Sequence, residues 1–198
     1  MASPPLRLRF LTSAPDLDHL PPTRAEVTVL GRSNVGKSSL LNALSGGKDV
    51  AKTSKKPGRT RLLNAFALDE DATVVDCPGY GYAQVSKAER AAWQDMVDDY
   101  LLGRDELMMA MVLVDGEVGP TKLDVAELDW LREHRVPHTV VATKHDKVRS
   151  AKRERRKRDL AAGCGLERGD IVWVSAHSGV GIDRLRALVR LWVSPPPR

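Results

Sequence analysis

Residues 31–38 read Gly-Arg-Ser-Asn-Val-Gly-Lys-Ser, between a β-branched run at residues 26–30 and a helix-compatible run that begins at Lys37. This G-x-x-x-x-G-K-[ST] pattern in a strand–helix context predicts a phosphate-binding loop rather than a chance glycine-rich turn. Gly31 and Gly36 carry no Cβ, so the backbone N–H groups can wrap closely around phosphate oxygens, aided by the helix start. Lys37 would meet the β- and γ-phosphates, and the Ser38 hydroxyl would bind Mg²⁺. The candidate phosphate-binding residues are Gly31, Arg32, Ser33, Asn34, Val35, Gly36, Lys37 and Ser38.

Outward from this loop, predicted strands and helices alternate along the chain, which is typical of an α/β fold. Strands are expected at residues 26–30, 61–68, 72–75, 107–114, 138–142 and 170–174. The short turn at 69–71 makes 61–68 and 72–75 an antiparallel pair. We therefore expect a three-layer α/β fold, with a mostly parallel central sheet, one antiparallel edge strand and helices on both faces.

Helical patterns separate the strands. Residues 86–102 begin with a capping-box pattern, Ser86 followed by Glu89, and a charged helix is expected at 150–162. A closing helix has an apolar stripe from Ile182 to Trp192. The helix at 121–134 is expected to bury one apolar face, made of Leu123, Ala126, Leu128 and Leu131.

Length and composition indicate a single domain. The chain has 198 residues, of which 42% are hydrophobic and 29% charged, as in ordinary globular proteins. We predict an N-terminal extension at 1–23, a globular domain at 24–193 and a flexible tail at 194–198. The longest apolar run, 107–114, is far short of the roughly 20 residues that span a bilayer, so no membrane partner is expected. The absence of a signal-peptide pattern, with two cysteines outside any metal-ligand spacing, favours a cytoplasmic location.

The base-binding prediction rests on Thr143, Lys144, His145 and Asp146, which follow a predicted strand at the ligand-binding edge of the sheet. The Asp146 carboxylate can accept two hydrogen bonds from guanine, whereas adenine offers no such donors and would leave the carboxylate unpaired. The stem of Lys144 can cover the purine plane. A lone K-x-D triplet is usually a surface accident, but its position downstream of a phosphate loop favours a guanine site.

A third motif, Asp76-Cys77-Pro78-Gly79, follows an apolar strand. Asp76 can hold Mg²⁺ through water, and the Gly79 N–H can reach the γ-phosphate, so that loss of this phosphate would release the segment beyond it. Asp76 as a plain turn residue is the alternative, and the order of the three motifs disfavours it.

The stretches GRSNVGKSSLLN, KPGRTRLLN, DCPGYGYA, TKHDK and VSA resemble the motifs of the EngB (YihA/YsxC) family, within the TrmE–Era–EngA–EngB–septin-like GTPases. The resemblance covers residues 10–192. It implies that the expected three-layer α/β fold is the P-loop GTPase fold and that residues 24–193 form an EngB-type GTPase domain. It also implies that Thr60 joins Ser38 on Mg²⁺ and that the loop after residue 173 contacts the guanine carbonyl. The further nucleotide-binding residues that it implies are Gly58, Arg59, Thr60, Arg61, Leu62, Val174, Ser175 and Ala176.

Tyr80 stands where Ras-like GTPases carry the glutamine that orients the attacking water. We therefore predict slow hydrolysis, with Lys37, Asn34, Thr60 and Gly79 as the catalytic candidates. In related GTPases an asparagine at the Asn34 position helps to bind K⁺, which would supply positive charge to the transition state. A role for Asn34 in hydrogen bonding within its own loop remains equally open.

Residues 147–158 hold eight Lys or Arg residues and one acid, Glu154, in a chain of net charge +5. Such a run is usually a solvated face, but its self-repulsion also fits a polyanion partner. The family resemblance implies assembly of the large ribosomal subunit, contact with its RNA, and a requirement for normal cell division and septation. Two other hypotheses remain: a P-loop metabolic enzyme such as a nucleotide kinase, and a division factor that acts away from the ribosome.

Overall fold

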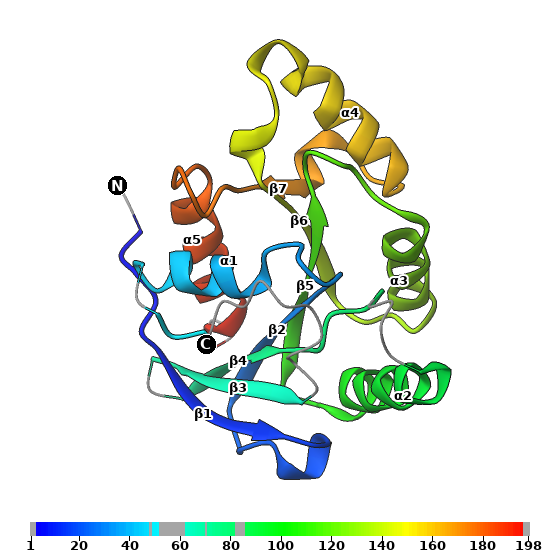
Figure 1. The fold of residues 1–198 in the computed structure, drawn as a ribbon. Helices are drawn as coiled ribbons and strands as arrows, with labels where there is room; N and C mark the ends of the chain where they lie inside the picture. The colour runs from blue at the N-terminus through cyan, green and yellow to red at the C-terminus, as the bar shows by residue number, and fades with distance from the viewer. Residues whose placement is uncertain (1–2, 48, 52–61, 70, 82–85, 196–198) are drawn as a thin grey trace.

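A seven-stranded sheet forms the centre of the molecule (Figure 1) in the order β1-β3-β4-β2-β5-β6-β7. The computed structural model describes residues 3–47, 49–51, 62–69, 71–81 and 86–195. The strands are β1 (Leu8–Ala14), β2 (Ala25–Gly31), β3 (Leu63–Leu68), β4 (Ala72–Asp76), β5 (Leu107–Asp115), β6 (His138–Thr143) and β7 (Ile171–Trp173). The α-helices are α1 (Lys37–Leu44), α2 (Lys87–Gly103), α3 (Lys122–Glu133), α4 (Arg153–Gly163) and α5 (Ile182–Val193).

Strand directions confirm the predicted, mostly parallel sheet with an antiparallel edge. Strand β2 pairs parallel with β4 and β5, and the parallel run continues through β6 to β7. Strand β3 is antiparallel to β4 on one side and to the edge strand β1 on the other. β1 comes from residues 1–23, so this N-terminal stretch is part of the sheet. After β2 the chain continues to β3 and β4 on one side of β2 and then crosses to β5 on its other side. Open α/β sheets bind ligands beyond the carboxyl ends of the strands where the strand order reverses in this way.

Helices cover both faces of the sheet, which gives the predicted three layers (Figure 1). Helices α1 and α5 pack on one face through Leu40, Leu41 and Leu185. Helices α2 and α3 cover the other face through Tyr100 and Leu128. Within the described residues no helix combines the length and apolar character needed to cross a membrane.

Two helix predictions are confirmed in detail. Helix α2 begins with the predicted capping box, in which the Glu89 N–H donates to Ser86 Oγ at 3.2 Å and the Ser86 N–H donates to Glu89 Oε2 at 3.1 Å. Helix α5 buries Ile182, Leu185 and Val189 from the predicted apolar stripe.

The predicted buried face of α3 is confirmed for Leu128 and Leu131 and wrong for Leu123 and Ala126. Leu123 is 51% exposed and Ala126 is also exposed, whereas the acidic residues Asp124 and Glu127 are buried beside Leu128. The reason is polar: Asp124 accepts hydrogen bonds from the helix N-cap and from Tyr80, so the helix turns its acidic positions inward.

The charged helix also starts later than predicted. Residues Ser150–Lys152 form a 3₁₀ turn, and α4 begins at Arg153. The Lys152 N–H donates to the Arg149 carbonyl at 2.8 Å, which is the i→i+3 pattern of a 3₁₀ helix. No side chain caps this turn or the start of α4 at Lys152, so the local sequence carries no capping signal that fixes the first residue of the helix.

Buried Glu127 leads to a test of stability. Burial, together with the nearby Asp98 and Asp124 carboxylates, raises its pKa from 4.5 to about 7. Because the folded pKa is raised, the contribution of Glu127 to stability falls as the pH rises from about 4.5 to about 7 and is then level. Glu127→Gln should therefore increase the free energy of unfolding by about 1–3 kcal/mol at pH 8 and hardly change it at pH 4.

Urea unfolding at the two pH values measures this difference. Glu133→Gln on the exposed surface of the same helix is the matched control and should show no such pH-dependent gain. Equal effects of the two substitutions at pH 8 would contradict the assignment.

Candidate functional site

The predicted phosphate loop (residues 31–38) joins β2 to α1 and lies directly against β5. Gly31 has φ +146°, and a Cβ there would lie 2.9 Å from the Leu113 carbonyl oxygen. Gly36 has φ +111° and forms the N-cap of α1. Asn34 also has a positive φ, 64°, which asparagine tolerates better than most residues. The loop therefore takes a path that few other sequences allow.

Lys37 reaches back over this loop. Its Nζ donates to the Gly31 carbonyl at 3.2 Å. Burial lowers the pKa of the Lys37 ammonium, and the charge of Asp76 opposes that shift. Lys37 is partly buried, as is Ser38 in the first turn of α1. One positive charge is thus held at the centre of the predicted phosphate site.

Asp76 ends β4 near this charge. Burial raises its pKa to about 6, against the favourable charge of Lys37. Within the described residues Asp76 Oδ1 has no hydrogen-bond partner, although it is fully buried. Such an orphaned carboxylate oxygen calls for a cation or a water. A single carboxylate, a serine hydroxyl, phosphate oxygens and water form the usual donor set for Mg²⁺, so Asp76 and Ser38 fit this ion.

Of the other residues in the 76–79 segment, Cys77 and Pro78 are buried and Gly79 lies at the predicted phosphate site. The Cys77 side chain is buried in the core with its Sγ 3.2 Å from Thr28 Oγ1, so only its backbone can face a ligand, and the adjacent Pro78 is also buried. Gly79 lies against the phosphate loop, since a Cβ there would be 2.8 Å from Lys37 Nζ and 2.9 Å from the Ser33 nitrogen.

The predicted base motif (residues 143–146) is attached to the phosphate loop by two side chains. Thr143 Oγ1 donates to the Val35 carbonyl at 2.8 Å. Lys144, in the left-handed region with φ 55°, donates through Nζ to the Asn34 carbonyl at 3.0 Å and to Asp115 Oδ2 at 2.7 Å. The two motifs therefore form one hydrogen-bonded unit.

Ser175 orients the Asp146 carboxylate. Its hydroxyl donates to Asp146 Oδ1 at 2.5 Å and accepts the Ser178 N–H at 3.0 Å. This hydrogen bond is the largest cause of the lowered pKa of Asp146, which keeps the carboxylate ionised. The buried His145 ring packs edge-on against the Trp173 ring. The backbone N–H of His145 donates to the Val174 carbonyl at 3.1 Å.

An open pocket of about 450 Å³ lies where these segments meet. Its walls combine the phosphate loop, the base motif and the loop after β7, with Gly36, Lys144, Asp146 and Ala176 among them. The structure thus brings together three separated stretches that the sequence singled out. Residues 58–61, including Thr60, lie outside the described residues, and Leu62 is 37% exposed.

The sequence analysis missed Asp115. This carboxylate pairs with Lys144 and also accepts the Glu117 and Val118 N–H groups at 2.9 and 3.2 Å. The Lys144 hydrogen bond is the largest of the effects that lower the pKa of Asp115 against its burial. An aspartate at the carboxyl end of a buried strand, on the ligand edge of the sheet, was the signal that could have identified it.

Comparison with known proteins gives a consistent result. A family model described as "50S ribosome-binding GTPase" matches residues 26–144. Relatives named "Probable GTP-binding protein EngB" from Streptococcus pyogenes serotypes M3 and M5 are each 42% identical over 176 residues, 88% of this chain and 88% of the relative.

Solved structures agree on the fold. One described as a probable GTP-binding protein engB has a TM-score of 0.69 and 23% identity, over 85% of this chain and 98% of that one. Another, Era in complex with MgGDPNP and nucleotides 1506–1542 of 16S ribosomal RNA, has a TM-score of 0.68 and 24% identity, over 90% of this chain and 59% of that one.

Proposed function

The chain belongs to the EngB family of GTP-binding proteins, and it is a GTPase. From this premise we propose that it is a slow, Mg²⁺-dependent switch in the cytoplasm that acts in assembly of the large ribosomal subunit and is needed for normal cell division and septation. The family match disfavours a nucleotide kinase. A division role away from the ribosome has no observation in its favour here.

The observation that carries the guanine assignment is the carboxylate of Asp146, held by Ser175 at the rim of the pocket beside the phosphate loop. Held at a fixed angle, a carboxylate can accept the ring N–H and the exocyclic amino group of guanine together. Lys144, fixed by Asp115, is placed to cover the ring. The backbone of Val174, Ser175 and Ala176 would then meet the guanine carbonyl.

Asp146→Asn tests this assignment. The amide can still accept the Ser175 hydrogen bond, so the loop should stay folded, but it no longer offers two acceptors to guanine. We expect GDP affinity to fall by about 10²–10⁴-fold while affinity for xanthosine diphosphate rises. Titration of both nucleotides against wild type and the exposed control Asp129→Asn measures the switch. Unchanged preference for guanine would place the base elsewhere.

We assign Mg²⁺ to Ser38 and Thr60, with Asp76 acting through water. The buried, unpartnered Asp76 oxygen supports this assignment. When bound, the ion would neutralise charge on the β- and γ-phosphates. Lys37 holds the same phosphates as a fixed charge, and Gly79 offers its N–H at the γ-phosphate.

Slow hydrolysis follows from Tyr80, which has no amide to orient water. We propose that K⁺, bound with help from Asn34, partly makes up for this. Asn34 is exposed, and no described residue hydrogen-bonds its side-chain amide, so the amide is available to a cation.

Single-turnover GTP hydrolysis should be at least about fivefold faster in K⁺ than in Na⁺ at equal ionic strength, because added positive charge stabilises the phosphoryl-transfer transition state. Asn34→Gly should lose this difference, since glycine tolerates the positive φ but has no amide. Equal wild-type rates in the two salts would refute the K⁺ role and leave Asn34 as a loop residue.

The basic segment at residues 147–158 is our candidate contact with ribosomal RNA. Four of its cations, Lys147, Arg149, Lys152 and Arg158, are exposed and have no ion pair within the described part of the chain. Its acid, Glu154, is already paired with Lys157 and Arg168. The segment follows the base motif directly and lies at the β6–β7 end of the sheet (Figure 1), so bound nucleotide and bound RNA would be close.

A triple substitution, Arg149, Lys152 and Arg158 to alanine, should weaken co-sedimentation of the GTP-loaded protein with large ribosomal subunits. The logarithm of the affinity falls linearly with the logarithm of the salt concentration, and three lost phosphate contacts should make this slope less steep by about 2–3. The matched control changes three exposed cations elsewhere to alanine: Arg9, Lys122 and Arg184. Equal losses in both variants, or a flat salt response in wild type, would argue against this surface.

A further inference from the structure

Asp124, the third residue of α3, connects three parts of the site that sequence analysis treated separately. The carboxylate is fully buried. Its Oδ1 accepts the Tyr80 hydroxyl at 2.9 Å, and its Oδ2 lies 3.1 Å from Arg32 Nε. Oδ2 also accepts the Thr121 hydroxyl and N–H, both at 2.8 Å. The Asp124 carboxylate therefore joins three segments: the phosphate loop through Arg32, the segment after Gly79 through Tyr80, and the start of α3 through Thr121.

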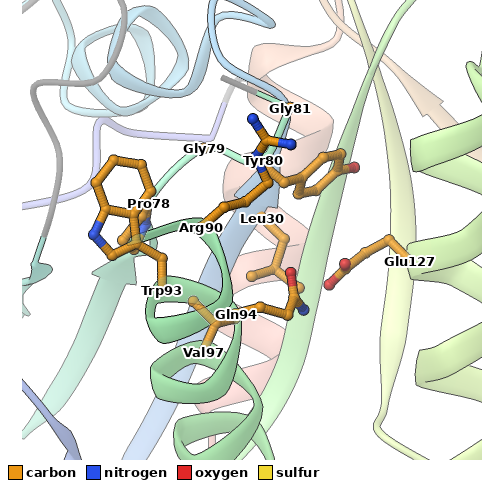
Figure 2. A pocket seen from close by; sticks show the side chains of 10 residues that line it. All are labelled: Leu30, Pro78, Gly79, Tyr80, Gly81, Arg90, Trp93, Gln94, Val97 and Glu127. Atoms are coloured by element: carbon orange, nitrogen blue, oxygen red, sulfur yellow. The ribbon is translucent and has the colours of Figure 1, made fainter. Parts of the chain in front are cut away.

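The backbone of this region is closed onto the phosphate loop. Tyr80 and Arg32 form an isolated parallel bridge, and the Ser33 N–H donates to the Tyr80 carbonyl at 3.1 Å. The Tyr80 side chain lines a narrow hollow of about 30 Å³ between α2, α3 and residues 78–81. Figure 2 shows its ring together with Glu127 on one side of that hollow and Trp93 on the other.

This closed arrangement conflicts with a third phosphate. A γ-phosphate has to reach the Lys37 ammonium and the Gly79 N–H. Gly79, however, lies so close that a Cβ would be only 2.8 Å from Lys37 Nζ. A phosphate group that entered between them would push Gly79 away from Lys37. Tyr80 then moves as well, and its hydrogen bonds to Ser33 and Asp124 are strained or lost. A nucleoside diphosphate has no γ-phosphate and would leave Gly79 and Tyr80 in place.

We propose that Tyr80, Asp124 and Arg32 form a latch that sets the preference for nucleoside diphosphate over triphosphate at this site. The inference rests on the assignment of residues 31–38 as the phosphate loop. A γ-phosphate binds only by opening the latch, and its loss lets the latch close again.

The chemistry of the contact suits this role. Burial and the neighbouring Asp124 charge raise the pKa of the Tyr80 hydroxyl, so it remains a donor at all physiological pH values. Its acceptor is charged, and hydrogen bonds to charged groups are stronger than neutral ones. Arg32 balances the carboxylate, and Asp124 keeps its Thr121 bonds when Tyr80 leaves. Asp124 therefore stays partnered in both states.

Tyr80→Phe tests the latch, because it removes only the hydroxyl and keeps the ring. The affinity for a non-hydrolysable GTP analogue relative to GDP should rise about 10-fold, with GDP affinity within about twofold of wild type. Equilibrium titration of both nucleotides gives the ratio.

Tyr100→Phe is a matched control. The Tyr100 hydroxyl makes the same kind of buried bond, 2.8 Å to Glu26 Oε1, but away from the phosphate loop, so the ratio should not change. An unchanged or lowered ratio in Tyr80→Phe, or an equal loss of both nucleotides, would overturn the proposal. Failure of wild type to bind any guanine nucleotide would instead refute the base and phosphate assignments.

Discussion

The contact between Gly31 and the backbone of β5 determines where the phosphate loop lies. No side chain fits between Gly31 and the Leu113 carbonyl, so the loop turns within contact distance of the central sheet. That depth brings Val35 and Asn34 within reach of the next strand, where Thr143 and Lys144 bind their carbonyls. A loop one side chain farther out could not make these bonds. The position of the base motif relative to the phosphates thus follows from a glycine at the end of β2.

Three buried aspartates at the sheet edge have different surroundings, and these surroundings separate their roles. Asp115 is paired with Lys144 and serves as a fixed support. Asp124 is shared among Tyr80, Arg32 and Thr121 and joins parts that can separate. Asp76 has a raised pKa and an unpartnered oxygen. Since an unpaired buried carboxylate is costly, Asp76 is the one of the three that lacks a partner within the described part of the chain and calls for a cation or a water.

Much of this arrangement could be predicted from sequence, because it depends on order and on local pattern. The loop at Gly31, the base motif after β6 and the α2 capping box each occupy the expected place. The exposure of Leu123 and the burial of Asp124 on α3 could not be predicted, because hydrophobic periodicity predicts a leucine in the core and an aspartate at the surface. Only the tertiary partners of Asp124 reverse that order. Asp115 was missed for a similar reason, because its role depends on a partner 29 residues away.

The hydrogen bonds divide the site into a fixed part and a movable part. The base motif, Asp115 and residues 31–38 are joined to one another by Thr143, Lys144 and the sheet itself. Residues 79 and 80 touch this unit through backbone contacts with Arg32 and Ser33 and a hydrogen bond from the Ser33 hydroxyl to the Gly79 carbonyl. Tyr80 is also linked to Arg32 through the Asp124 carboxylate of α3. Base and first two phosphates would be held by the fixed part, whose geometry need not change between GDP and GTP. The third phosphate alone would meet the movable part, so the difference in free energy between the two states would arise there. That is the arrangement a switch requires, because a ligand shifts an equilibrium only through the contacts that differ between its two states.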